Sequence, residues 1–325
     1  MKQLITFRCL SIAIFILILG MSVDAQDVHY AQVQDLKLWF NPALKTNRKS
    51  LGHLHYRSAK YPGIMAYSSK GIDIDLPMDN SDDNEEDNVK FANLTFGMNT
   101  DNGDGLNSST AMMGFSYALP LNYNNTYLAL GFQAAYNFSR LATDGYNVFP
   151  KQFDQNGPVG AAISADPAQT GYTIQYFTGG SGLALFHNDE KKQWYVGCSA
   201  RHLNQPITQT TFSSTYRLAI SYGIQLGYST KINDRASLSG FANFIWQNKF
   251  YEHVVGIQYT LNLDDSSNLA LSFGTNWKIN DALIPNVEFK ITKNRFSFYY
   301  EINLPGTPAY MYKRSGFDIS YQRDF

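Results

Sequence analysis

The chain has little cysteine and little charge for its length. Only two of its 325 residues are cysteines, and Cys9 lies in the apolar stretch at the start of the sequence. Removal of that stretch would leave Cys198 alone, which excludes an internal disulfide. Charged residues make up 16% of the chain and the net charge is −1. There is therefore no electrostatic case for nucleic acid as a partner.

Long apolar runs are missing after the first 25 residues. The mean hydropathy is slightly polar, which excludes a helical membrane protein. It does not exclude a membrane β-barrel, because the residues of such a barrel alternate between lipid and lumen.

The first 25 residues have the pattern of an export signal. Lys2 and Arg8 precede an apolar core at Leu10–Leu19, and Val23-Asp24-Ala25 offers small residues at the −3 and −1 positions. We therefore predict a signal peptide at 1–25, cleaved before Gln26. A membrane anchor fits less well, because the apolar run is shorter than the ~20 residues of a spanning helix.

Aromatic residues are abundant, at 15% of the chain with 22 Tyr and 22 Phe. This load is high for a soluble protein, and tyrosine is expected where rings lie at a membrane–water interface.

Apolar and small residues alternate along many short segments. In Leu128–Phe138 one face carries large apolar residues, and the other carries Ala, Gly, Gln and Asn. The segments Leu218–Ser229, Val255–Leu261 and Leu269–Trp277 repeat this pattern. A soluble β-sandwich also alternates, but its polar face usually carries charged residues. Small polar residues instead favour the crowded, watery interior of a membrane barrel.

The last segment, Ser315–Phe325, resembles the closing strand of an outer-membrane barrel. Phe317, Ile319, Tyr321 and Phe325 share one face, because successive side chains of a strand point to opposite faces. We predict that this strand pairs with Leu51–Ala59. Tyr321 and Phe325 would form the C-terminal signal that the barrel-insertion machinery recognises.

The segments together predict an all-β fold, a transmembrane antiparallel β-barrel of about 14 strands and FadL-like size. It would occupy 51–325, after a periplasmic or lumenal arm at 26–50. Short connections should alternate with longer ones at Asn99–Ser109, Ser139–Thr178, Leu203–Thr215 and Leu304–Arg314. The predicted strands are 51–59, 64–72, 89–99, 110–120, 126–138, 179–187, 193–202, 216–230, 235–247, 252–262, 268–278, 283–292, 295–303 and 315–325.

One predicted short turn, Asp73–Asn88, instead carries an acidic insertion at Asp79–Asp87. A charge run of this kind is typically solvated. The alternatives are a docking site for a basic periplasmic partner or a weak cation site. The run lacks the ligand spacing of a Ca²⁺ loop, as does the Asp- and Gly-rich turn at Asp101–Gly105.

Residues capable of chemistry do not form a recognisable catalytic pattern. His53 and His55 share a strand face, but no cysteine or third histidine lies near them in sequence, so a structural role is favoured. Ser199 with His202, and His253 with Glu252, lack a nucleophile elbow and the spacing of a base and its orienting group. We therefore predict no catalytic residues, no cofactor and no metal.

Several motifs, in this order and spacing, resemble the PorP/SprF-type outer-membrane proteins of the type IX secretion system, over nearly the whole mature sequence. These motifs are Phe40-Asn41-Pro42-Ala43, His55-Tyr56-Arg57 with Tyr61-Pro62-Gly63, Tyr67–Pro77, Asp101–Gly105, Leu119-Pro120-Leu121, Leu130–Ala134 and His202-Leu203-Asn204-Gln205-Pro206. The resemblance marks Asn41, Pro42, Ala43, Tyr56, Arg57, His202, Gln205 and Pro206 as structural or partner-binding positions.

The resemblance implies a non-enzymatic barrel in the outer-membrane lipid. Such proteins help to export or anchor secreted surface proteins, such as gliding-motility adhesins, whose C-terminal domains target them to type IX secretion. The implied partners are such a client, bound at the extracellular loops, and periplasmic type IX components or peptidoglycan-linked proteins.

Two other functions stay open at this stage. One is a passive or hydrophobic-solute outer-membrane channel, because fatty-acid transporters of this kind also have fourteen strands. The other is a soluble secreted β protein. The sequence does not show whether the 26–50 arm plugs the lumen or reaches a periplasmic partner.

Overall fold

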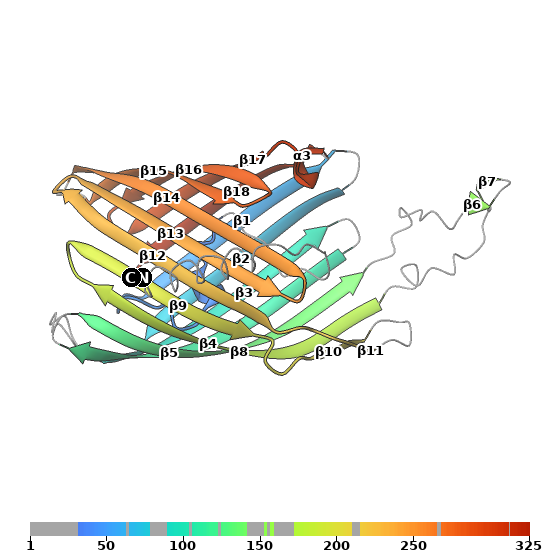
Figure 1. The fold of residues 1–325 in the computed structure, drawn as a ribbon, viewed down its shortest axis with the longest axis horizontal. Coiled ribbons are helices and arrows are strands. Elements are labelled where there is room, and N and C mark those ends of the chain that lie inside the picture. The colour runs from blue at the N-terminus through green and yellow to red at the C-terminus, as the bar shows by residue number, and fades with distance from the viewer. Residues whose placement is uncertain are drawn as a thin grey trace, which may run out of the picture.

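Fourteen strands close into one antiparallel barrel in a computed structural model (Figure 1). The structure describes residues 32–62, 65–78, 90–103, 106–122, 125–141, 153–154, 157–158, 172–209, 215–264, 268–311 and 313–325. The predicted signal peptide at 1–25 and the acidic insertion at Asp79–Asp87 lie outside these ranges. The predicted fold class and strand number are confirmed.

The barrel strands lie close to the predicted segments. They are β1 (Leu51–Tyr61), β2 (Met65–Pro77), β3 (Phe91–Gly103), β4 (Leu106–Asn122), β5 (Thr126–Leu141), β8 (Tyr172–Asn188), β9 (Lys192–Arg201), β12 (Ser221–Asn233), β13 (Ala236–Gln247), β14 (Phe250–Asp264), β15 (Leu269–Lys278), β16 (Ala282–Ile291), β17 (Asn294–Asn303) and β18 (Ser315–Asp324).

Short elements occupy the described parts of the connections. Two small hairpins lie outside the barrel sheet, and two one-turn helices precede β1 and β18. These elements are β6 (Phe153–Asp154) with β7 (Gly157–Pro158), β10 (Ile207–Gln209) with β11 (Thr215–Arg217), α2 (Lys37–Phe40) and α3 (Pro308–Met311). No helix among the described residues is long and apolar enough to cross a membrane, a finding that does not bear on strands.

The first and last strands pair to close the barrel. This pairing is the one that the sequence predicted, and its register runs from Leu51 opposite Asp324 to Lys60 opposite Ser315. We call the end of the barrel that holds Leu51 and Phe325 the terminal end, and the other the opposite end. In lipid, every backbone N–H and C=O must find a partner within the protein, and closure removes the two free strand edges.

The period-two pattern separates two surfaces as predicted. Large apolar side chains such as Phe132, Ile257 and Phe273 stay about half exposed on the outer wall. Asp318 and Ser320, on the other face of β18, are buried in the lumen. The outer surface is therefore the one suited to lipid.

The predicted strands were too short at several ends. β3 continues to Gly103 and β4 begins at Leu106, so the predicted Asn99–Ser109 loop is mostly paired strand. β2 continues to Pro77, which places Asp73 within the strand and not in a turn. In a barrel, polar residues near a strand end can turn their side chains into the lumen while the backbone stays paired.

The predicted start of one strand was wrong. β12 begins at Ser221, and Leu218 is buried in the connection before it, where its N–H donates to Pro206 O at 3.0 Å. The apolar alternation therefore starts before the point where the chain enters the barrel wall.

The outward face can be tested with one charge. Ile257 lies in the middle of β14 with its side chain 51% exposed, and Gln258 beside it faces the lumen, where it hydrogen-bonds Glu288. We expect Ile257→Arg to lower the free energy of unfolding in lipid vesicles by about 2–4 kcal/mol, because the charge enters the bilayer midplane. Gln258→Arg, next to a carboxylate, should cost much less. Equal losses in urea titrations would contradict this assignment of faces.

Candidate functional site: the lumen and its N-terminal arm

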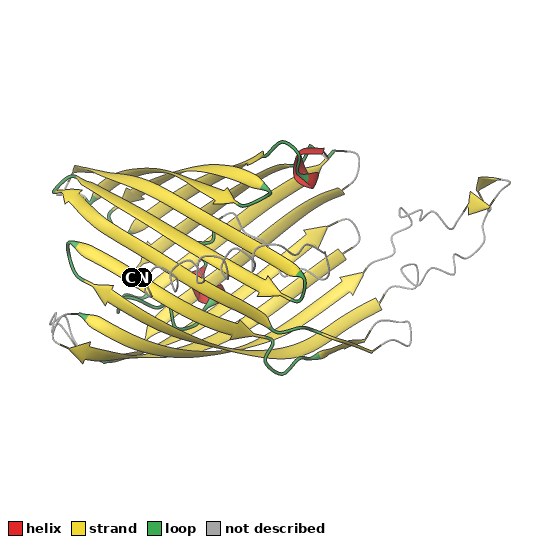
Figure 2. Cartoon of the chain, in the orientation of Figure 1, coloured by secondary structure: helices red, strands yellow, loops and turns green. Residues whose placement is uncertain are grey.

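Residues 32–50 run inside the barrel before β1 begins. Figure 2 shows the one-turn helix α2 of this segment enclosed by the strands. We call residues 32–50 the arm. Its apolar side chains pack against well-separated parts of the wall. Leu38, Ala43 and Leu44 join a cluster with residues of β3, β4, β5 and β8, whereas Val33, Leu36 and Phe40 join residues of β13 and β14.

Asn41 attaches the arm to three strands. Its Nδ2 donates to Gln225 Oε1 at 2.9 Å and to Cys198 O at 3.2 Å, while its Oδ1 accepts from the Ala43 N–H at 2.9 Å. A third carbonyl, that of Leu183, lies 3.4 Å from Nδ2. The side chain is fully buried. The position therefore requires a side chain that both donates and accepts, which an amide provides.

Glycines in the wall make room for this part of the arm. A Cβ on Gly131 of β5 would lie 2.5 Å from backbone atoms of Pro42 and Ala43. A Cβ on Gly182 of β8 would overlap Asn41 Oδ1. Real Cβ contacts of this length essentially do not occur, so the Asn-Pro-Ala motif and the small wall residues form one packing unit.

Charged groups attach the arm to other parts of the wall. Lys45 forms an ion pair with Asp75 of β2, whose carboxylate is completely buried and also accepts from Thr95 Oγ1 at 3.0 Å. Asp35 accepts from the Tyr299 hydroxyl of β17 at 2.9 Å. Burial lowers the pKa of Lys37 in α2 to about 8, and the neighbouring positive charge of Lys45 adds to this shift.

Arg57 belongs to a second polar layer, nearer the opposite end. Its guanidinium lies 2.6 Å from Glu301 of β17 and 3.6 Å from Asp318 of β18, so it joins strands on both sides of the closing seam. Arg314 contacts Glu301 at 3.0 Å and Asp281 at 3.1 Å. Tyr56, the next residue in the motif, packs against Phe317, with ring centroids 6.0 Å apart.

His202, Gln205 and Pro206 form a folded turn at the end of β9. His202 and Gln205 both have positive φ, and the Gln205 N–H donates to His202 O at 2.9 Å. The His202 imidazole is buried against Thr178 Oγ1 of β8 at 2.8 Å. These contacts attach the turn to β8, so the motif shapes the wall at the opposite end.

The residue pairs considered as catalytic candidates contact other groups in the structure. Ser199 Oγ accepts from Gln225 Nε2 at 3.3 Å, while the His202 ring bonds Thr178. Nδ1 of His253 contacts the backbone carbonyl of Glu252, at 3.0 Å. Each of these bonds holds neighbouring strands or the local backbone.

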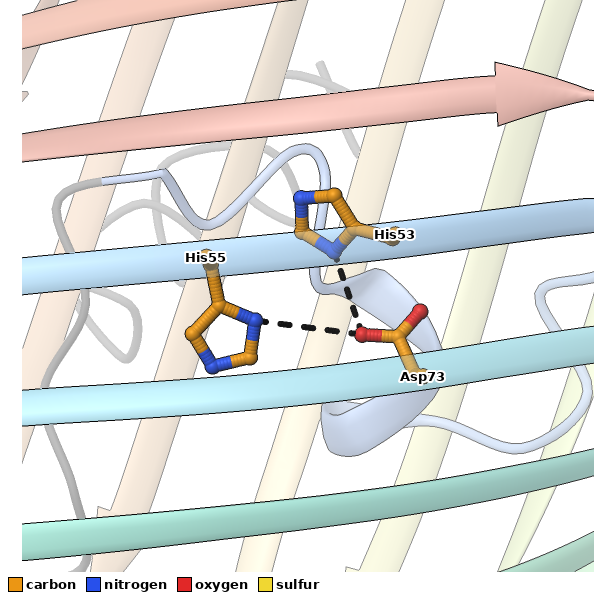
Figure 3. Close-up of side chains that lie close together, drawn as sticks. All are labelled: His53, His55 and Asp73. Carbon is orange, nitrogen blue, oxygen red and sulfur yellow. Dashed lines mark hydrogen bonds and ion pairs between the residues drawn. The ribbon is translucent and has the colours of Figure 1, made fainter.

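The structure also joins residues that sequence reasoning left apart. Asp73 of β2 lies opposite His53 of β1, and the rings of His53 and His55 both face its carboxylate (Figure 3). The alternation Ile72-Asp73-Ile74-Asp75 was the signal that could have placed two carboxylates in the lumen, had β2 been extended this far.

The fit between glycine and arm predicts a local release of the arm. In a chain carrying Cys198→Ser, Leu44→Cys provides a cysteine on the arm for maleimide labelling. We expect Gly182→Ala to speed labelling of this cysteine at least ~tenfold, which corresponds to a loss of about 1.4 kcal/mol in the binding of the arm to the wall. Gly179→Ala on the same strand is the matched control, because the nearest atom to its Cβ would be Gln133 O at 4.0 Å, an ordinary van der Waals contact. Similar labelling rates in both variants would contradict the packing unit.

The ion pair between arm and wall predicts a stability effect. Lys45→Met should cost about 3–5 kcal/mol, because it leaves the buried Asp75 carboxylate without its cation. The double variant Lys45→Met/Asp75→Leu should recover most of this loss. Lys49→Met, at an exposed position of the arm, should stay within about 0.5 kcal/mol of the parent protein. Urea unfolding followed by tryptophan fluorescence measures all three. A single variant as stable as the parent would show that the pair does not hold the arm.

Solved structures with a similar fold are outer-membrane barrels of low sequence identity. The toluene transporter TbuX of Ralstonia pickettii matches with a TM-score of 0.53 and 12% identity, over 89% of this chain and 93% of that one. The CymD monoaromatic hydrocarbon channel matches with a TM-score of 0.50 and 11% identity, over 93% and 95% of the two chains. At such identities the likeness shows the fold alone.

A family model gives the more specific finding. No protein of curated function matches the sequence. The model described as type IX secretion system membrane protein PorP/SprF matches residues 22–321, nearly the whole chain. The apolar outer wall of the closed barrel and this match together support an outer-membrane location. The chain belongs to the PorP/SprF family of type IX secretion system membrane proteins.

Proposed function

We propose that this protein is a non-enzymatic barrel that helps export or anchor a secreted cell-surface protein, with its lumen occupied by its own arm. The observation that carries the proposal is the seating of residues 32–50 on strands around the lumen, from β2 to β17. An element fixed by Asn41, Lys45 and two apolar clusters is costly to displace for each passing solute. A scaffold does not require the arm to be displaced.

The opposite end of the barrel is the proposed client surface, facing the cell exterior. There the connection before β18 carries α3, with Tyr310 and Met311 strongly exposed. Arg314, at the base of this connection, binds Asp281 and Glu301, which gives the exposed aromatic and apolar side chains a fixed support. Supported apolar side chains of this kind suit a protein partner. The client would be a secreted protein with a type IX C-terminal targeting domain, such as a gliding adhesin.

The terminal end is proposed to face the periplasm. Cleavage of the signal peptide before Gln26 would leave residues 26–31 as the N-terminus of the mature chain, ahead of the arm. Phe325 keeps its side chain 65% exposed, as recognition by the barrel-insertion machinery requires. Periplasmic type IX components or peptidoglycan-linked proteins would meet this end, where the Asp79–Asp87 insertion follows β2.

Loss of the protein should change the cell surface and leave solute uptake intact. We expect a deletion strain to lose or shed one or more surface proteins, measured by protease shaving and mass spectrometry of intact cells. Plasmid-borne parent protein should restore them. Tyr310→Ser/Met311→Ser should restore them poorly, while Tyr228→Ser on the outer wall serves as the control. A deletion strain with an unchanged surface would sink the proposal.

A hydrophobic-solute channel is the second candidate, favoured by the fold shared with the toluene transporter TbuX and the CymD channel. Conductance in planar bilayers separates the two functions. The scaffold predicts a closed parent barrel and a steady, large conductance only after removal of residues 32–45. Steady conductance of the parent protein would favour the channel.

A further inference from the structure

Two histidines and a carboxylate meet in the lumen wall, where the arm covers them. His53 and His55 are two residues apart on β1, so both point inward, and Asp73 lies directly opposite His53 on β2. All three side chains are buried. Figure 3 shows both imidazoles turned toward the same carboxylate.

The three groups have the spacing of a metal ligand set. Asp73 Oδ1 lies 3.1 Å from His53 Nδ1 and 3.9 Å from His55 Nδ1, and the candidate ligand atoms are all within 4.8 Å of one another. Ligand atoms ~2.1 Å from a tetrahedral Zn²⁺ stand ~3.4 Å apart. The observed distances lie on either side of this value, so a cation needs only small side-chain shifts.

The two histidines approach the Asp73 carboxylate at different distances. His53 Nδ1 is within hydrogen-bonding distance of Asp73, whereas the His55 separation of 3.9 Å is too long for such a bond. A cation placed among the three groups would lie close to both rings and to this one oxygen.

Neighbouring groups set the orientation of His55. Asn99 Nδ2 donates to Asp101 Oδ2 at 3.1 Å, which turns its Oδ1 toward His55 Nε2 at 3.4 Å. Nε2 therefore carries the hydrogen, and Nδ1 directs its lone pair toward Asp73. An imidazole whose second nitrogen is held by an oxygen acceptor is the usual arrangement of a metal-bound histidine.

The wall makes room for this cluster, and the arm contacts it. The His55 ring occupies the space that a Cβ on Gly71, its cross-strand neighbour, would fill. Trp39 of the arm donates from Nε1 to Asp73 Oδ1 at 3.4 Å, so the carboxylate is held from the lumen side as well.

We propose that His53, His55 and Asp73 bind one divalent first-row transition-metal ion, with zinc the best match to two imidazoles and a carboxylate. Water would complete the coordination. The ion would join β1 to β2 beneath Trp39 and so stabilise the wall on which the arm rests. This site is independent of the proposed secretion role.

The test uses the full chain, purified in mild detergent without a polyhistidine tag. After dialysis against Zn²⁺ at micromolar free concentration, we expect one zinc per chain by elemental analysis. Co²⁺ should bind in its place with visible d–d absorption bands typical of nitrogen and oxygen ligands. This spectrum needs no variant, so it tests the site even if a substitution prevents folding. A parent protein that binds no metal overturns the proposal.

Variants locate the ion. His55→Ala and Asp73→Asn should each weaken zinc binding at least ~10–100-fold, since even the loss of an outer partner has an effect of this size. His253→Ala, on the outer wall of β14, should bind as the parent does. Heat-modifiable migration on gels verifies that each barrel is folded. Equal zinc binding by all variants would refute the site. The zinc would then be an adventitious ion only, bound elsewhere, for example by the acidic residues of Asp79–Asp87.

Discussion

The pairing of every backbone N–H and C=O within the wall is the constraint on which the rest of this structure depends. A membrane interior offers no water to free strand edges, so β1 and β18 must meet. Fourteen strands enclose a wider space than eight, the number at which side chains just fill a barrel. The space left inside must hold water, a ligand or more protein. Here residues 32–50 of the same chain occupy it.

The wall and the arm are complementary in both shape and charge. Gly131 and Gly182 lie where the backbone and side chain of the Asn-Pro-Ala motif come closest. Asp75 faces the arm where Lys45 arrives. A lumen built only to pass solutes would gain nothing from these matches. Asn41, Pro42 and Ala43, which the family resemblance singles out, therefore have a physical role in this structure, because they fix the arm in the interior.

Period-two alternation was enough to predict the strands, their number and the closing pair, because lipid and lumen impose opposite preferences on successive residues. It failed where that contrast fades. The predicted turn at Asp73–Asn88 begins too early, because Asp73 lies within β2. The predicted strand at 216–230 also begins too early, because Leu218 precedes the start of β12 at Ser221. The contacts of Asn41 could not be predicted, because the arm has no periodicity and its partners depend on barrel register. The same holds for Asp73 beside His53 and His55, which requires the alignment of β1 with β2.

The contacts of Asn41 have a consequence for the order of assembly. Its partners Leu183, Cys198 and Gln225 follow it by 142, 157 and 184 residues, and Tyr299 follows Asp35 by 264. The arm thus cannot make all of its contacts until nearly the last strands exist. Contacts so distant in sequence form slowly, since loop-closure entropy must be overcome first. The contacts of the arm can therefore be complete only when the barrel itself is complete.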